Sequence, residues 1–85
     1  MNTVYILKCN DDTLYCGSTV DIEKRIKEHN ESKNGAKYTC ARRPVTLVYQ
    51  EDCETLAIAR AREAEIKRMK REEKLLLIKD IESPK

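Results

Sequence analysis

The chain has 85 residues, of which 38% are charged, a formal net charge of +2, and neither Trp nor Phe. A chain this short forms one small domain with a thin stability margin, and its grouped apolar residues exclude a wholly disordered chain. The four cysteines form no C-x-x-C pair and are accompanied by a single His, which argues against a zinc site.

The charge is unevenly distributed along the chain. Residues 1–21 carry a net charge of −2, residues 22–46 carry +4, and residues 47–85 carry 0. The middle third is a candidate phosphate-binding surface, although a solvated surface without a ligand is the simpler explanation. With no visible signal peptide or membrane span, we expect a cytoplasmic location, reduced thiols and no membrane partner.

The first elements form a predicted hairpin, residues 3–9 and 14–18, separated by a polar turn. A two-residue loop at Asp11 and Asp12 would place Tyr5 and Tyr15 on opposite faces of the sheet. A three-residue loop over 11–13 would place both tyrosines on one face, because side chains alternate along a strand. Such a loop needs one left-handed residue, which Asp tolerates. The sequence permits both registers, and we predict the odd loop.

A helix follows over residues 22–30, with Asp21 as its predicted N-terminal cap. A polar loop then runs to Pro44, and residues 45–50 form the third predicted strand. The expected fold class is therefore α+β, a three-stranded antiparallel-type sheet with flanking helices in the order β-β-α-β-α-α. We expect one domain over residues 1–82.

The C-terminal part is predicted to be helical. Asp52 or Glu54 opens a long helix that runs to about Met69. Residues 71–81 form either a final helix or a continuation of the same one, and we expect residues 83–85 to fray.

Four motifs occur in a fixed order: TVY at 3–5, YCG at 15–17, EKRIKEHN at 23–30 and REAEIK at 62–67. Together they resemble the GIY-YIG nuclease superfamily, and the resemblance covers nearly the whole chain. GAKYT at 35–39 is similar to the small single-domain UPF0213 subgroup and to the nuclease domain of structure-specific junction endonucleases.

The resemblance implies a metal-dependent endonuclease that hydrolyses phosphodiester bonds in DNA, on branched, nicked or single-stranded forms, in repair or recombination. It implies one Mg²⁺ or Mn²⁺ ion, held by Glu63, and gives Gly17 a structural place at the site. The implied catalytic residues are Tyr5, Tyr15, Arg25, His29 and Glu63.

Three positions depart from the family pattern. Thr3 and Cys16 replace residues of the two triplets, and both are scaffold positions rather than reactive ones. Lys70 stands where the family commonly has a Ser that caps the last helix. Because Lys cannot cap an N-terminus, we expect the helix break near residues 69–71 to be weak or absent.

The residue types fit the implied chemistry, although each also has an ordinary structural explanation. Arg25 and His29 lie four apart and share a helix face; Arg suits phosphate, and His can shuttle a proton. Arg25 could instead pair with Glu28 or Glu23 in solvent. A helical wheel does not choose between Glu63 and Glu65, and Glu63 could simply pair with Lys67.

The polar loop supplies candidate nucleic-acid contacts, because a tyrosine among cations can stack on an unpaired base while the cations follow the backbone. A solvated loop is the competing explanation. A binding module without turnover and a protein-interaction domain remain alternative functions for the chain. The candidate binding residues are Lys33, Lys37, Tyr38, Arg42 and Arg43.

Overall fold

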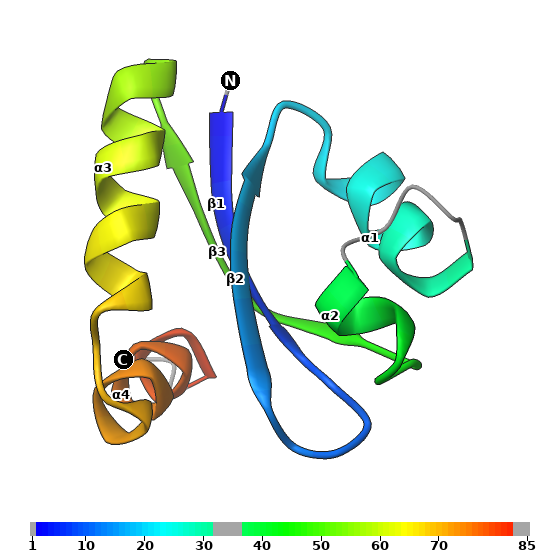
Figure 1. The fold of residues 1–85 in the computed structure, drawn as a ribbon. Helices are drawn as coiled ribbons and strands as arrows, with labels where there is room; N and C mark the ends of the chain where they lie inside the picture. The colour runs from blue at the N-terminus through cyan, green and yellow to red at the C-terminus, as the bar shows by residue number, and fades with distance from the viewer. Residues whose placement is uncertain (1, 32–36, 83–85) are drawn as a thin grey trace.

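The computed structural model describes residues 2–31 and 37–82 (Figure 1). The predicted frayed end and Lys33 therefore lie outside the described residues. None of the described helices is long and apolar enough to cross a membrane. The elements, in chain order, are β1 (Asn2–Lys8), β2 (Leu14–Thr19), α1 (Ile22–Glu31), α2 (Lys37–Cys40), β3 (Thr46–Cys53), α3 (Leu56–Lys67) and α4 (Arg71–Glu82).

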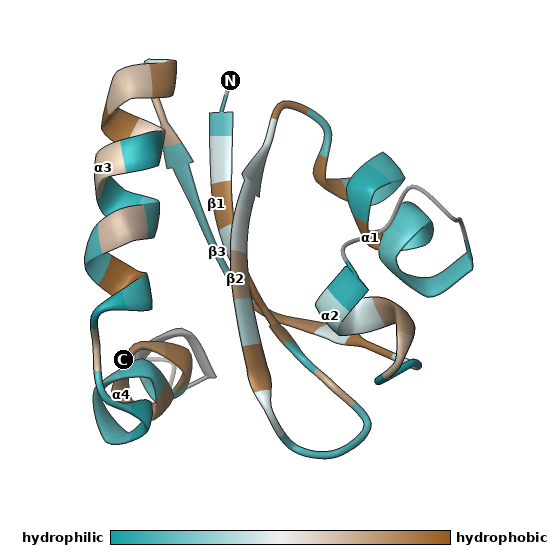
Figure 2. Ribbon diagram, in the orientation of Figure 1, coloured by the Kyte–Doolittle hydropathy of each residue, from teal (hydrophilic) through white to brown (hydrophobic). Residues whose placement is uncertain are grey.

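The predicted α+β fold is confirmed. The strands form one antiparallel sheet in the order β2-β1-β3, so β2 and β3 are edge strands. Figure 1 shows α3 and α4 on one side of the sheet and α1 and α2 on the other. Hydrophobic segments lie along the strands and on parts of α3 and α4, whereas α1 is largely hydrophilic (Figure 2).

Alternation along β1 divides the core into two clusters. Val4 and Ile6 pack with residues of α3 and α4, including Ala59. Tyr5 and Leu7 point to the other face, where partly buried side chains of α1 cover them. Because β1 is the central strand, both faces are apolar, and Tyr5 is held between the sheet and α1.

The hairpin has the predicted odd loop, with a shifted register. Tyr5 pairs with Gly17, and Cys9 N donates to Thr13 O at 2.8 Å, so the loop is residues 10–12 rather than 11–13. Asp12 is the left-handed residue, with φ of 66°. Asp11 Oδ1 closes the turn by accepting from Thr13 Oγ1 at 2.6 Å. The register moves by two residues, so both tyrosines stay on one face.

Two helix boundaries test the capping predictions. Asp21 caps α1 as expected, since its Oδ1 accepts from Lys24 N at 3.2 Å. The cap of α3 is Thr55, whose Oγ1 accepts from Ile58 N at 3.1 Å, so the expected start at Asp52 or Glu54 was wrong. The reason is that β3 extends to Cys53 to pair with the whole of β1. The predicted polar loop also contains α2, which we did not predict.

The last two helices are separate, so the expectation of a weak or absent break at Lys70 was wrong. Lys70 N donates to Glu73 Oε1 at 3.1 Å. This is the reciprocal half of a capping box, in which a Glu side chain reaches back to the backbone before the helix. The Glu73 side chain thereby satisfies the Lys70 N–H, and Glu73 N donates to Lys70 O at 3.0 Å, so the helix starts here without a capping Ser.

Candidate active site

The buried centre of the site joins β1, α1 and α2. Tyr5 Oη lies 2.8 Å from His29 Nε2, and His29 Nδ1 lies 2.7 Å from Thr39 Oγ1. Tyr5 is 1% exposed, and His29 and Thr39 are 0% exposed. Each ring nitrogen therefore has a hydroxyl partner, which satisfies an imidazole that water does not reach.

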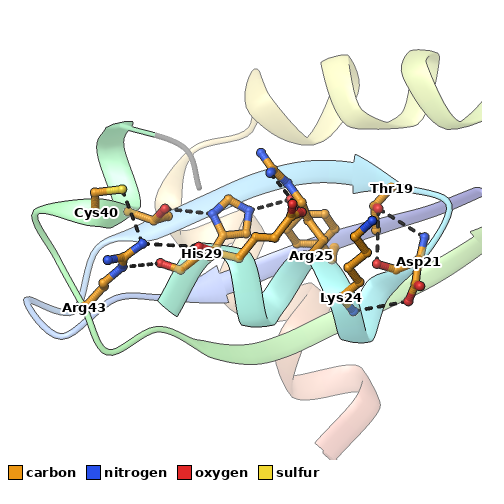
Figure 3. Close-up of polar contacts among 10 residues, drawn as sticks. Thr19, Asp21, Lys24, Arg25, His29, Cys40 and Arg43 are labelled. Carbon is orange, nitrogen blue, oxygen red and sulfur yellow. Dashed lines mark hydrogen bonds and ion pairs between the residues drawn. The ribbon is translucent and has the colours of Figure 1, made fainter. Parts of the chain in front are cut away.

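Arg25 lies one helical turn before His29 on α1, as the i, i+4 spacing predicted (Figure 3). Burial raises the pKa of Tyr5 to about 12, and hydrogen bonding from Arg25 opposes that rise. Arg25 Nη1 also lies 3.4 Å from Glu28 Oε1, so one of the anticipated ion pairs is present. The Arg25 guanidinium therefore contacts the buried Tyr5 hydroxyl on one side and the partly exposed Glu28 on the other.

Tyr15 forms the more exposed side of the centre. Its ring meets the His29 ring at 5.2 Å between centroids, edge on, and stacks with Tyr38 at 5.9 Å. Arg42 lies 3.9 Å over the Tyr38 ring, and its Nε is 3.0 Å from Asp11 Oδ2. The hairpin turn is thereby tied to α2, and Tyr15 is held against His29.

Gly17 is required by the tyrosines rather than by backbone strain. It lies opposite Tyr5 in the β1–β2 register, and a Cβ at this position would lie 2.6 Å from Tyr5 Oη and 2.8 Å from its Cζ. The same Cβ would lie 3.3 Å from Tyr15 Cε2. The absent side chain therefore leaves the space that the Tyr5 ring fills.

We expect Gly17→Ala to lower the free energy of unfolding by about 1–3 kcal/mol, the usual cost of overpacking a well-packed site. Tyr5 is buried and cannot swing away without losing His29. Urea denaturation measures the effect. In a Tyr5→Phe background the loss should be smaller, because the closest atom is gone; equal losses in both backgrounds would contradict the assignment.

His29 is neutral at neutral pH. Burial lowers its pKa to about 4, and the nearby Arg25 charge adds to the effect. Glu28 opposes this lowering, and Arg43 reinforces it. In a neutral imidazole one nitrogen donates and the other accepts, so the Tyr5 and Thr39 hydroxyls play opposite roles.

This pKa predicts an acid-labile fold. Between pH of about 6.5 and 4 the unfolded chain binds a proton at His29 that the folded chain does not, so the free energy of unfolding falls as pH falls. The loss across that window should be on the order of 3 kcal/mol. Urea titrations at several pH values measure it. His29→Gln should show a shallower slope, and an unchanged slope would contradict the assignment.

Glu63 approaches from α3 at the edge strand β2. Ser18 Oγ donates to Glu63 Oε1 at 2.6 Å, and Lys67 Nζ lies 2.6 Å from Oε2. The negative charge of Glu63 contributes to the raised pKa of Tyr5, so the two groups interact electrostatically. Glu65 instead pairs with Arg62. Glu63 is therefore held against β2 on the α3 side of the sheet, where its charge reaches Tyr5, whereas Glu65 is paired within α3.

The single carboxylate of Glu63 suits a hard metal cation that prefers oxygen ligands. Within residues 2–31 and 37–82, no group of three or more His, Cys, Asp or Glu residues could hold an ion. A single carboxylate fits Mg²⁺ or Mn²⁺, hard cations that prefer oxygen ligands; Mg²⁺ keeps several waters and takes other ligands from substrate phosphate. The Glu63 side chain is 20% exposed and its partner Lys67 52%, so the lysine can leave the carboxylate. Metal binding by Glu63 stays a prediction.

The candidate nucleic-acid residues have different surroundings. Lys37 is exposed at the start of α2. Arg43 Nε donates to His29 O at 2.5 Å and its Nη2 donates to Glu28 O at 3.2 Å, so this arginine stabilises the C-terminal end of α1 (Figure 3). Nucleic-acid contact by these residues and by Tyr38 and Arg42 stays a prediction.

Sequence reasoning missed two side chains that contact the site: Thr39 binds His29, and Ser18 binds Glu63. The ion pair between Glu63 and Lys67, considered from the sequence, is present. Strand alternation could have placed Ser18 on the face opposite Gly17. No sequence signal pointed to Thr39, because α2 was expected to be a loop.

The sheet, the tyrosine pair and the helix-borne Arg and His together form the arrangement expected of a nuclease fold. A family model described as the GIY-YIG catalytic domain matches residues 1–75, and the chain belongs to the GIY-YIG family.

The similar proteins belong to the UPF0213 group. A UPF0213 protein of Syntrophus aciditrophicus is 60% identical over 78 residues, 92% of this chain and 90% of that protein. One from Staphylococcus saprophyticus is 54% identical over 77 residues, covering 91% and 93%. The solution NMR structure of a UPF0213 protein from Bacillus halodurans matches with a TM-score of 0.60 at 41% identity, covering 93% of this chain and 84% of that one.

Proposed function

We propose that this protein is a metal-dependent endonuclease that hydrolyses phosphodiester bonds in DNA. The observation that carries the proposal is the Tyr5–His29 contact of 2.8 Å beside Arg25, with Glu63 at the neighbouring strand edge. Hydrolysis needs charge stabilisation on the phosphate, movement of a proton from water, and neutralisation of the leaving oxygen. Arg25 meets the first need and Tyr5 with His29 meets the second, while a metal ion held by Glu63 would meet the third.

Arg25 binds the scissile phosphate. Its guanidinium stays charged and donates two parallel hydrogen bonds to phosphate oxygens. The ion pair with Glu28 is only partly buried, so exchanging it for a phosphate costs little. Arg25 thus stabilises the negative charge that develops during attack.

Tyr5 and His29 manage the proton. Since burial raises the pKa of Tyr5 to about 12, its hydroxyl cannot ionise alone at neutral pH. Neutral His29 Nε2, at 2.8 Å, can accept that proton when the tyrosine oxygen takes one from the attacking water. Tyr15, less buried and packed on His29, lines the side from which substrate approaches.

Glu63 is the residue that would hold Mg²⁺ or Mn²⁺, with Ser18 keeping the carboxylate oriented. Such an ion supplies charge neutralisation at phosphate oxygens when bound. Lys67 must first release Oε2, and its charge is then available to the DNA backbone.

We propose branched, nicked or single-stranded DNA as substrate, in repair or recombination. Lys37, Tyr38 and Arg42 surround the site on α2 and the following turn, where an unpaired strand could follow the cations. The experiment is incubation of purified protein with plasmid, nicked and branched DNA, with and without Mg²⁺. Metal-dependent cleavage that Tyr5→Phe removes supports the proposal, and absence of cleavage on all forms opposes it.

A nucleic-acid-binding module without turnover is the second candidate. The observation that favours it is the Glu63–Lys67 ion pair of 2.6 Å, which occupies the carboxylate that metal would need. Binding that weakens steeply with salt, without any cleavage in Mg²⁺ or Mn²⁺, would select this function, because phosphate contacts release counterions.

A further inference from the structure

We propose that Thr39 is a positioning residue that holds His29 in the Nδ1–H tautomer, so that Nε2 is left free of a proton and faces Tyr5. The inference deepens the proposed function, but its main test does not depend on cleavage. The geometry behind it is a row of three side chains from three elements: Tyr5 of β1, His29 of α1 and Thr39 of α2.

Because these side chains are buried, their hydrogen bonds determine which ring nitrogen of His29 carries the hydrogen. His29 and Thr39 are 0% exposed, so no water can take the place of Thr39 at Nδ1. A buried ring nitrogen without a hydrogen bond is costly, because it has lost its water partners and gained none in the protein. The Tyr5 oxygen accepts from Arg25, which leaves the Tyr5 hydrogen available to Nε2; Nδ1 then carries the ring hydrogen and donates to Thr39 Oγ1, 2.7 Å away.

The tautomer decides what Tyr5 can do. If Nδ1 carries the hydrogen and donates to Thr39 Oγ1, the Nε2 lone pair receives the Tyr5 O–H. When Tyr5 takes a proton from water, its own proton moves to Nε2, and the imidazolium keeps its Nδ1–H bond to Thr39. In the opposite tautomer Nε2 already holds a hydrogen and cannot accept the Tyr5 proton.

The position of Thr39 is itself fixed. Arg42 N donates to Thr39 O at 3.0 Å, which closes the turn after α2, and the neighbouring Tyr38 stacks on Tyr15. The short helix therefore places two consecutive residues against the two tyrosines of the site, one through a ring contact and one through His29. This gives α2 a defined role in the chemistry.

The test uses the fact that the chain contains a single histidine. In ¹⁵N-histidine-labelled protein without a purification tag, the two ring nitrogens report the tautomer directly at pH 7. We expect Nδ1–H in the wild type and in Thr39→Ser, which keeps the hydroxyl. Thr39→Val keeps the shape without an acceptor, and we expect a shift to Nε2–H. A wild type already in the Nε2–H form, or a valine variant still in the Nδ1–H form, would overturn the proposal.

The wild-type spectrum alone can overturn the inference, so it stays testable if Thr39→Val does not fold. Cleavage is a second, separate readout. Thr39→Val should lower kcat about 100-fold or more, the scale of general acid–base catalysis, with KM little changed, and Thr39→Ser should restore most of it. If no variant cleaves DNA but the tautomers behave as expected, the proposed nuclease function fails and the positioning role stands.

Discussion

Arg25→Ala should reduce DNA cleavage by roughly 10²–10³ while leaving the fold intact, because loss of one transition-state donor typically has an effect of that size. Arg25 is partly exposed beside the buried Tyr5, so its removal opens no core cavity. Its exposed-side ion pair with Glu28 contributes little to stability. Arg25 also donates a hydrogen bond to the buried Tyr5 hydroxyl, so we expect the free energy of unfolding to fall by about 1.5–3 kcal/mol with the fold retained.

The matched control is Lys27→Ala on the same helix. Lys27 is exposed and lies two residues from Arg25, so it points away from the Arg25 and His29 side of α1. Both variants remove one positive charge, and both should weaken DNA binding slightly through the general electrostatic term. Only Arg25→Ala should remove turnover; cleavage within threefold of wild type would exclude Arg25 from the reaction.

The fold could be predicted because its local signals agree with its packing. Side chains alternate along β1, so Tyr5 shares a face with Leu7 and not with Val4 or Ile6, wherever the turn lies. The turn itself was displaced by one residue, since Asp11 and Thr13 close it through side-chain bonds that composition does not reveal. Likewise Thr55 caps α3 only because β3 runs three residues further than its own β-formers suggested.

The sequence predicted which of the main site residues share a face, but it did not predict the side chain that hydrogen-bonds His29. Helical spacing brought Arg25 and His29 to one face, and an odd hairpin loop brought the tyrosines together. The partner of His29 could not be found this way, because Thr39 belongs to a four-residue helix whose shape is imposed by tertiary contacts. Sequence spacing carries no information on such a contact.

The choice between the two glutamates of α3 is likewise a tertiary effect. Both lie on the flanks of the apolar stripe, yet Ser18 binds Glu63 and Arg62 binds Glu65. A contact with the edge strand β2 therefore separates Glu63 from Glu65, although a helical wheel places both on the flanks of the same stripe. Each glutamate also has one cationic partner, Lys67 or Arg62, so the two positions form a matched pair for an experiment.

Glu63→Gln should abolish metal-dependent cleavage, whereas Glu65→Gln should leave it nearly unchanged. The amide keeps the shape of the side chain and can still accept from Ser18, but it loses the charge, and Mg²⁺ prefers anionic oxygen. Each substitution also removes one ion pair, so their small stability costs should match.

The measurement is a titration of Mg²⁺ against cleavage rate for both variants, together with DNA binding in the absence of metal. Metal-free binding by Glu63→Gln should equal or exceed that of the wild type, because a negative charge near the phosphate is gone and Lys67 is released from its ion pair. Loss of cleavage in Glu65→Gln alone would move the metal site by half a helical turn. Normal cleavage by both variants would remove the metal from α3 altogether, since α3 contains no other carboxylate.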